Sequence, residues 1–95
     1  MKKKTPKPSE VLRRAAQLVA HNPYVCGCGA IGRAWRLHTK RWVLARNTAA
    51  YKYFVLIKPG NKTAGDYWFP IGPEGADQRI IALCMAAAVA ESEGN

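Results

Sequence analysis

Two cysteines and two histidines are the side chains whose types and spacing could do chemistry. Cys26 and Cys28 are separated by one residue, His21 and His38 lie on either side of them, and Cys84 lies far along the chain. Structural zinc sites use cysteines with two to four residues between them and a second ligand pair of similar spacing. Cys26 and Cys28 are one residue closer together than this spacing requires, and the sequence has no second ligand pair. The sequence therefore predicts no metal site and no metal cofactor.

A nucleophilic cysteine is the other chemistry to weigh, because the surrounding positive charge would favour a thiolate and a histidine could act as its base. No third group that would orient the base is evident. His38 fits an apolar helical stripe, where a hydrogen-bonded core histidine is the commoner outcome, and Cys84 lies inside an apolar run, as a small buried hydrophobe does. No pair of carboxylates has a basis for a shared site. We predict that the protein is not an enzyme and needs no cofactor.

Three glycines, Gly27, Gly29 and Gly32, have the spacing of a dinucleotide-binding loop. That motif needs a preceding strand, whereas here a helix that ends at a proline comes before it. The preceding helix therefore excludes a dinucleotide fingerprint and leaves only anion binding at a helix start.

The strongest functional signal is a basic and aromatic stretch from Arg33 to Arg46, which contains five Arg or Lys residues and two tryptophans. Cations contact phosphates and rings stack on bases, so the mixture suits nucleic acid. Trp35 and Trp42 are seven residues apart and would share one face of a helix, so we expect both in the core. The cations then remain as the candidate partner-binding surface, with two from the first helix: Arg13, Arg14, Arg33, Arg36, Lys40 and Arg41.

Charge is distributed unevenly along the chain. Residues 1–62 hold 14 of the 15 basic residues and a single acid, Glu10, which gives +13, whereas the remainder carries −4. Such a field attracts polyanions or an acidic protein surface and accelerates association with them. A solvated basic face kept for solubility is the alternative that the sequence leaves open.

Length and composition predict one compact domain. The chain has 95 residues, of which 48% are hydrophobic, enough for one core and too few for two domains. The basic start lacks the apolar run of a secretion signal, and the longest apolar run, Ile80–Ala90, has about half the length of a membrane-spanning helix. We therefore expect free thiols in a reducing cytoplasm and no membrane partner.

The first elements follow from prolines and periodicity. Residues 1–8 combine lysines with prolines and are expected to form an extended, mobile arm, and residues 9–95 the domain. Ser9 is the expected N-cap of a helix that stops at His21-Asn22-Pro23. Its apolar residues recur at helical spacing, opposite Arg13, Arg14 and Gln17.

The middle of the chain leaves alternatives open. An apolar stripe predicts one basic amphipathic helix over Ile31–Ala49, and the rival is a break near His38-Thr39 with a strand over Arg41–Arg46. Tyr51–Lys58 has the composition of a strand, yet Asn47 looks like the cap of a helix that would end at Pro59-Gly60.

The last element is the clearest. Asp77 is a plausible cap for a helix over 78–93, which is apolar on all sides from Ile80 to Ala90 and should lie centrally, its alanines allowing close packing. The fold class expected is a mainly α-helical, single-domain bundle. An α+β fold with a hairpin over Tyr51–Ile71 is the alternative, in which the aromatic segment 67–69 is core or a self-association patch.

The order of these features resembles a loosely defined group of small phage and prophage proteins. The resemblance is carried by the paired cysteines with Ala30-Ile31, a Tyr-Phe segment before Lys58-Pro59, the Tyr-Trp-Phe of 67–69 and the Arg-Ile-Ile-Ala-Leu run with its alanines. It implies a mainly helical fold and transfers no active residues. Small phage proteins of this kind often bind and disable host machinery, including CRISPR effectors.

From these observations the sequence predicts a non-catalytic, phage-type binding protein. Its basic face would occlude a host protein or ribonucleoprotein complex that handles nucleic acid or serves in defence. The alternative is a small basic DNA-binding or RNA-binding accessory protein.

Overall fold

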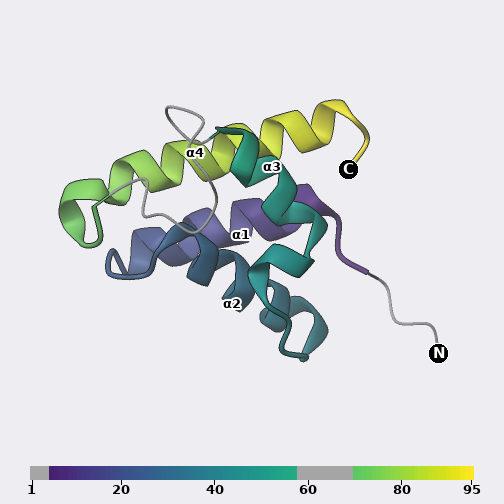
Figure 1. Cartoon of the computed structure of the whole chain (residues 1–95), viewed down its shortest axis with the longest axis horizontal. Helices are drawn as coiled ribbons and strands as arrows, with labels where there is room; N and C mark the ends of the chain where they lie inside the picture. The colour runs from purple at the N-terminus through teal and green to yellow at the C-terminus, as the bar shows by residue number, and fades with distance from the viewer. Residues whose placement is uncertain (1–4, 58–69) are drawn as a thin grey trace.

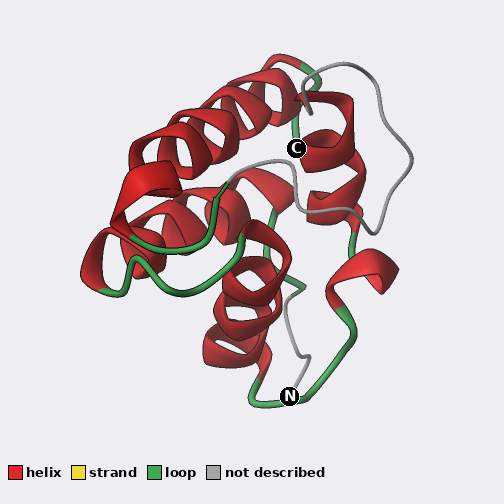
Figure 2. Ribbon diagram, turned by 60° about the vertical axis from the view of Figure 1, so that its left-hand side comes forward, coloured by secondary structure: helices red, strands yellow, loops and turns green. Residues whose placement is uncertain are grey.

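The computed structural model describes residues 5–57 and 70–95, and these residues form helices joined by short connections (Figure 1). The elements in chain order are α1 (Pro8–His21), α2 (Gly27–Thr39), a 3-10 turn η1 (Ala45–Asn47), α3 (Ala49–Ile57) and α4 (Pro73–Ser92). The described residues contain no strand (Figure 2). The mainly α-helical class is confirmed.

The strand and hairpin interpretation of Tyr51–Lys58 is wrong as far as Ile57, because α3 covers these residues. The rest of the hairpin, the Pro59-Gly60 stop and the aromatic segment 67–69 lie outside the described residues. Within the described residues, no helix has both the length and the apolar character needed to cross a membrane.

α1 packs against α2, α3 and α4 and supplies much of the core. Its apolar stripe is buried as predicted, with Val11, Leu12, Ala15 and Val19 at 0% exposure. The polar residues predicted on the opposite face are exposed, and the helix ends at His21, before the proline. The alternation of apolar and polar residues at helical spacing therefore predicted both the helix and its buried face.

α1 and α4 lie side by side and antiparallel, and the first turn of α1 holds the C-terminus (Figure 1). The Ser9 backbone N–H and hydroxyl both donate to the carbonyl of Asn95, at 3.1 and 3.0 Å. The prediction that Ser9 caps the helix is wrong, because α1 begins at Pro8 with Lys7 as its N-cap. Proline suits the first helical position, where an N–H would have no intrahelical partner.

α4 begins one turn earlier than predicted, at Pro73 rather than after Asp77. Gly72 precedes it with φ of 103°, a conformation that glycine adopts without steric cost. The alanines of the helix are packed in the core, with Ala86, Ala87 and Ala90 at 0% exposure. The prediction that this helix is buried on all sides is wrong. Ile81 and Met85 are 57% and 51% exposed, on the face turned away from α1 and α3.

α2 ends at Thr39, so the single helix over Ile31–Ala49 is wrong and the break near His38-Thr39 is confirmed. The alternative strand over Arg41–Arg46 is wrong too, because a loop and η1 follow. The residue that caps the start of α3 is Thr48, not Asn47 as predicted. The Thr48 hydroxyl accepts the Tyr51 N–H at 3.2 Å and donates to the Ala45 carbonyl at 2.6 Å, as a capping side chain does.

The buried guanidinium of Arg79 joins two distant connections. The side chain is 1% exposed and donates to the carbonyls of Pro23, Pro70 and Gly72, the last at 3.3 Å. Pro23 also accepts the Gly72 N–H at 3.0 Å. Arg79 thereby attaches the turn between α1 and α2 to the segment that leads into α4. Gly75 must remain small beside it, because an added Cβ would lie 2.0 Å from the Pro70 oxygen.

We expect Arg79→Met to lower the free energy of unfolding by about 3 kcal/mol, because the carbonyls of Pro23, Pro70 and Gly72 each lose a hydrogen bond from the buried guanidinium. The measurement is urea unfolding followed by circular dichroism. Arg46→Met at an exposed position is the matched control and should change stability by less than about 0.5 kcal/mol. Equal stability of the two variants would contradict the role given to Arg79.

Two glycines of α2 should respond oppositely to alanine. A Cβ on Gly27 would lie 2.4 Å from the Phe54 ring, whereas a Cβ on Gly32 would meet nothing closer than the Val43 oxygen at 3.9 Å. Gly27→Ala should destabilise the protein by about 1–3 kcal/mol through overpacking. Gly32→Ala should stabilise it by about 0.5–1 kcal/mol through helix propensity. Thermal unfolding of both variants checks the pair, and a shift in the same direction would refute the packing of α2 on α3.

Candidate functional site

The candidate site is built where α2 ends and the chain turns back. Lys40 takes a left-handed conformation, with φ of 62°, and its N–H donates to the Arg36 carbonyl at 2.7 Å. The Thr39 hydroxyl lies 3.0 Å from the Trp35 carbonyl, to which it donates, and accepts the Arg41 N–H at 3.2 Å. These bonds fix a sharp reversal of direction immediately after the helix.

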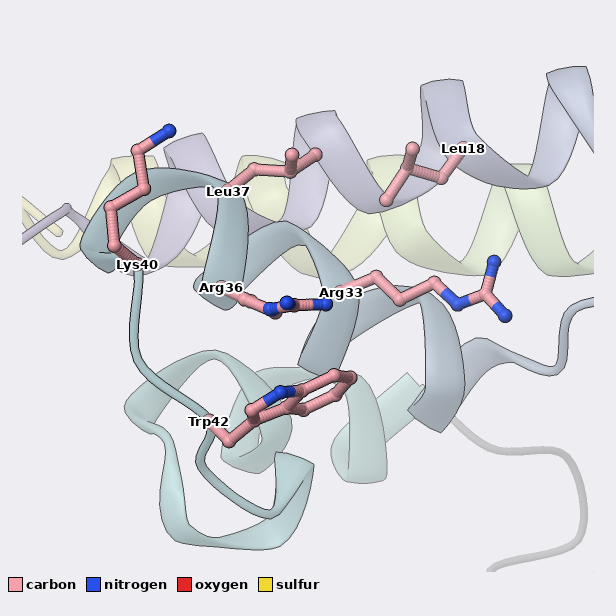
Figure 3. Close-up of a pocket in the computed structure, with 6 residues that line it drawn as sticks. All are labelled: Leu18, Arg33, Arg36, Leu37, Lys40 and Trp42. Carbon is pink, nitrogen blue, oxygen red and sulfur yellow. The ribbon is translucent and has the colours of Figure 1, made fainter.

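The reversal brings Trp42 back to α2. The Arg36 guanidinium lies over the Trp42 ring, 4.3 Å from its centroid (Figure 3). A cation over the face of an indole is attracted by the ring quadrupole. The Trp42 side chain nevertheless remains 68% exposed. The turn therefore presents a large aromatic side chain to solvent, held beside an arginine.

The left-handed backbone of Lys40 carries strain. For a residue with a Cβ this conformation costs about 1 kcal/mol, and glycine adopts it freely. Lysine is therefore not the residue that local backbone energy favours here. Lysine offers what glycine lacks, an ammonium group beside Arg36 and Trp42.

Two hollows meet at this turn. The first has a volume of about 650 Å³ and is lined by Leu18 of α1, by Arg33, Arg36 and Leu37 of α2, and by Lys40 and Trp42 (Figure 3). The second has a volume of about 570 Å³ and is lined by Thr5, Trp35, His38, Thr39, Lys40, Arg41, Trp42 and Val43. Lys40 and Trp42 line both and so form their common boundary.

The charge of the site is uniformly positive. The sequence has no Asp or Glu from Val11 to Ile57. Arg33, Arg36, Lys40 and Arg41 are exposed, and none of them forms an ion pair within the part of the chain that the structure describes. Four free cations around two hollows create a local potential that attracts anions.

The six predicted contact residues do not all belong to this site. Three of them, Arg33, Arg36 and Lys40, line the first hollow, and Arg41 lines the second. Arg14 is exposed on α1 one turn before Leu18, on the same side of the helix.

Arg13 faces α4, where its guanidinium makes two bonds of 2.9 and 2.7 Å to the Glu91 carboxylate. This hydrogen-bonded pairing raises the pKa of Arg13 and lowers the pKa of Glu91. The charge of Arg13 is therefore already paired within the protein, unlike the charges around the hollows.

The core prediction for the two tryptophans is half correct. Trp35 is partly buried and packs against the core, whereas Trp42 is exposed. The predicted core position of His38 is wrong as well, because this side chain is exposed. The error for Trp42 has a clear cause: the shared face required a continuous helix, and the helix ends at Thr39. No glycine marks the left-handed turn at Lys40, so the turn has no local signal in the sequence.

The cysteines have local roles. The Cys26 sulfur accepts the Gly29 N–H at 3.2 Å and caps α2, so the helix start considered for an anion already has this bond. Burial raises the pKa of Cys28, with a smaller contribution from Cys26. A thiol with a raised pKa stays protonated to higher pH and is a poorer nucleophile at neutral pH. Among the described residues, no group of three His, Cys, Asp or Glu side chains is placed to hold a metal ion.

Comparisons with protein families, curated proteins and solved structures find no match for this chain. The resemblance to small phage proteins therefore stays a prediction from the sequence.

Proposed function

We propose that this protein is a non-catalytic nucleic-acid-binding protein that holds a phosphate backbone with the cations around Trp42. The observation that supports it is the exposure of Trp42 among four cations without acidic partners. If Trp42 were in the core, a solvated helix face would be a sufficient explanation for the cations of this stretch. An exposed indole next to them combines a surface for bases with charges for phosphates.

The proposed mechanism is electrostatic. Arg33, Arg36 and Lys40 lie around one hollow, and Arg41 follows on the other side of Lys40, so a single strand of phosphates can contact successive cations. Neutralising about four phosphates releases condensed counterions, and the logarithm of affinity should fall with the logarithm of salt concentration with a slope of about −3. The proposed function requires no metal, cofactor or catalytic residue.

A phage-type inhibitor that occludes a host complex in the bacterial cytoplasm is the second candidate. The exposed apolar side chains Ile81 and Met85, one turn apart on α4, favour it, because phosphate binding has no use for them. Affinity capture from a bacterial lysate with and without nuclease separates the candidates. A stoichiometric protein retained after nuclease supports the inhibitor, and recovery of nucleic acid alone supports direct binding.

Reversing two charges in the first hollow should weaken binding. We expect Arg33→Glu with Arg36→Glu to lower the affinity for labelled oligo(dT) by at least about tenfold and to make the salt slope shallower by about 1.5. The measurement is fluorescence anisotropy over a series of salt concentrations. Arg46→Glu with Lys52→Glu is the matched control, because both residues are exposed, neither lines either hollow and the net charge is the same. Equal losses in the two double variants would show that only net charge matters and would contradict the proposed site.

Replacing Lys40 with glycine should separate stability from binding. We expect Lys40→Gly to raise the free energy of unfolding by about 0.5–1 kcal/mol, because glycine relieves the left-handed strain. The same variant should bind oligo(dT) more weakly, since the ammonium group between the hollows is lost. Urea unfolding and anisotropy on one preparation check both effects. A variant that is more stable and binds as tightly as the parent would remove Lys40 from the site.

A further inference from the structure

We propose that Trp42 divides the site into a phosphate side and a base side, which makes the ligand a single-stranded nucleic acid with at least one unpaired base stacked on Trp42. This inference rests on the proposed function and specifies its ligand. It follows from the difference between the two hollows and from the position of the indole between them.

The first hollow has the lining of a phosphate site. Three cations, Arg33, Arg36 and Lys40, line it together with two leucines, and Trp42 is the only aromatic residue among the described residues that line it (Figure 3). Guanidinium groups present several N–H donors in a planar fork that matches phosphate oxygens. Arg36 is already oriented by its position over the Trp42 ring, so less side-chain freedom is lost when it binds an anion.

The second hollow has the lining of a base site. Trp35, Trp42 and Val43 provide apolar and aromatic surface, and His38 provides a further flat ring. Lys40 and Arg41 line it as well, whereas Arg36 does not. The part of the indole that Arg36 leaves open is therefore available from this side. A base stacked on an aromatic side chain is recognised by its π-face, which tolerates any sequence.

Single-stranded nucleic acid is the class that fits both hollows at once. Lys40 and Trp42 form their common boundary, so one nucleotide can place its phosphate on one side and its base on the other. In a duplex the bases are paired and stacked inside the helix, and exposing one costs unstacking energy. A duplex would engage the cations alone.

The test compares three probes on the same protein: oligo(dT), a duplex of the same length, and inorganic polyphosphate, which carries charge without bases. Trp42→Ala should weaken oligo(dT) binding by about tenfold, the size of one lost stacking contact. The same variant should leave polyphosphate binding within about twofold, because every cation remains. Trp42→Tyr keeps a ring and should restore most of the affinity. Leu44→Ala, at another exposed apolar position outside both hollows, is the control and should change nothing.

The outcomes are distinguishable. Loss of oligo(dT) binding in Trp42→Ala, with polyphosphate binding kept and the circular dichroism spectrum unchanged, supports the division into two sides. Equal affinity of the parent protein for single strand and duplex, or an unchanged Trp42→Ala, overturns it while the proposed function stands. Failure of the parent protein to bind any of the three probes overturns both.

Discussion

The buried guanidinium of Arg79 is the constraint on which the arrangement of the helices depends. A charge enclosed in a core is costly unless it finds hydrogen-bond acceptors. Here both terminal nitrogens of the guanidinium donate to backbone carbonyls on two separate connections, while Nε has no partner among the described residues. Pro23 lies in the turn between α1 and α2, while Pro70 and Gly72 precede α4. Satisfying one side chain therefore fixes where the α1–α2 pair lies relative to α4. The absence of a side chain at Gly75 is part of the same contact, since a Cβ would displace the Pro70 carbonyl.

With α1 and α2 held in this way, the C-terminal end of α2 lies at the surface, where the candidate site is formed. The opposite surface of α1 is occupied by α4, where Arg13 and Ser9 form bonds to the C-terminal residues. Acidic and basic side chains meet there and neutralise each other locally. At the end of α2 no acid of the described residues forms an ion pair with the cations, so their potential is not balanced within that part of the chain. The division of charge along the sequence thus becomes a division between two regions of the fold.

The turn after α2 exposes an aromatic side chain and lowers local stability. Lys40 adopts a backbone conformation that favours glycine, and Trp42 leaves the core and lies beside Arg36 in solvent. Strain and exposed aromatic surface in a natural protein are commonly associated with sites of interaction. The phosphate side and the base side that we propose for this turn would account for both features.

The sequence alone determined the helices in which successive residues share the same local preference for helix. α1 and the body of α4 followed from apolar periodicity and helix-forming residues, and Pro23 set the end of α1, because these are local properties of the backbone. Tertiary structure decided the rest. Tyr51–Ile57 became helix against its strand propensity, since Phe54 packs on Gly27 in the core. Trp42, expected in the core, lies in solvent because α2 stops at Thr39. Arg79 is buried because carbonyls from distant segments surround it. Neither a left-handed lysine nor an acceptor more than fifty residues away is encoded in local periodicity.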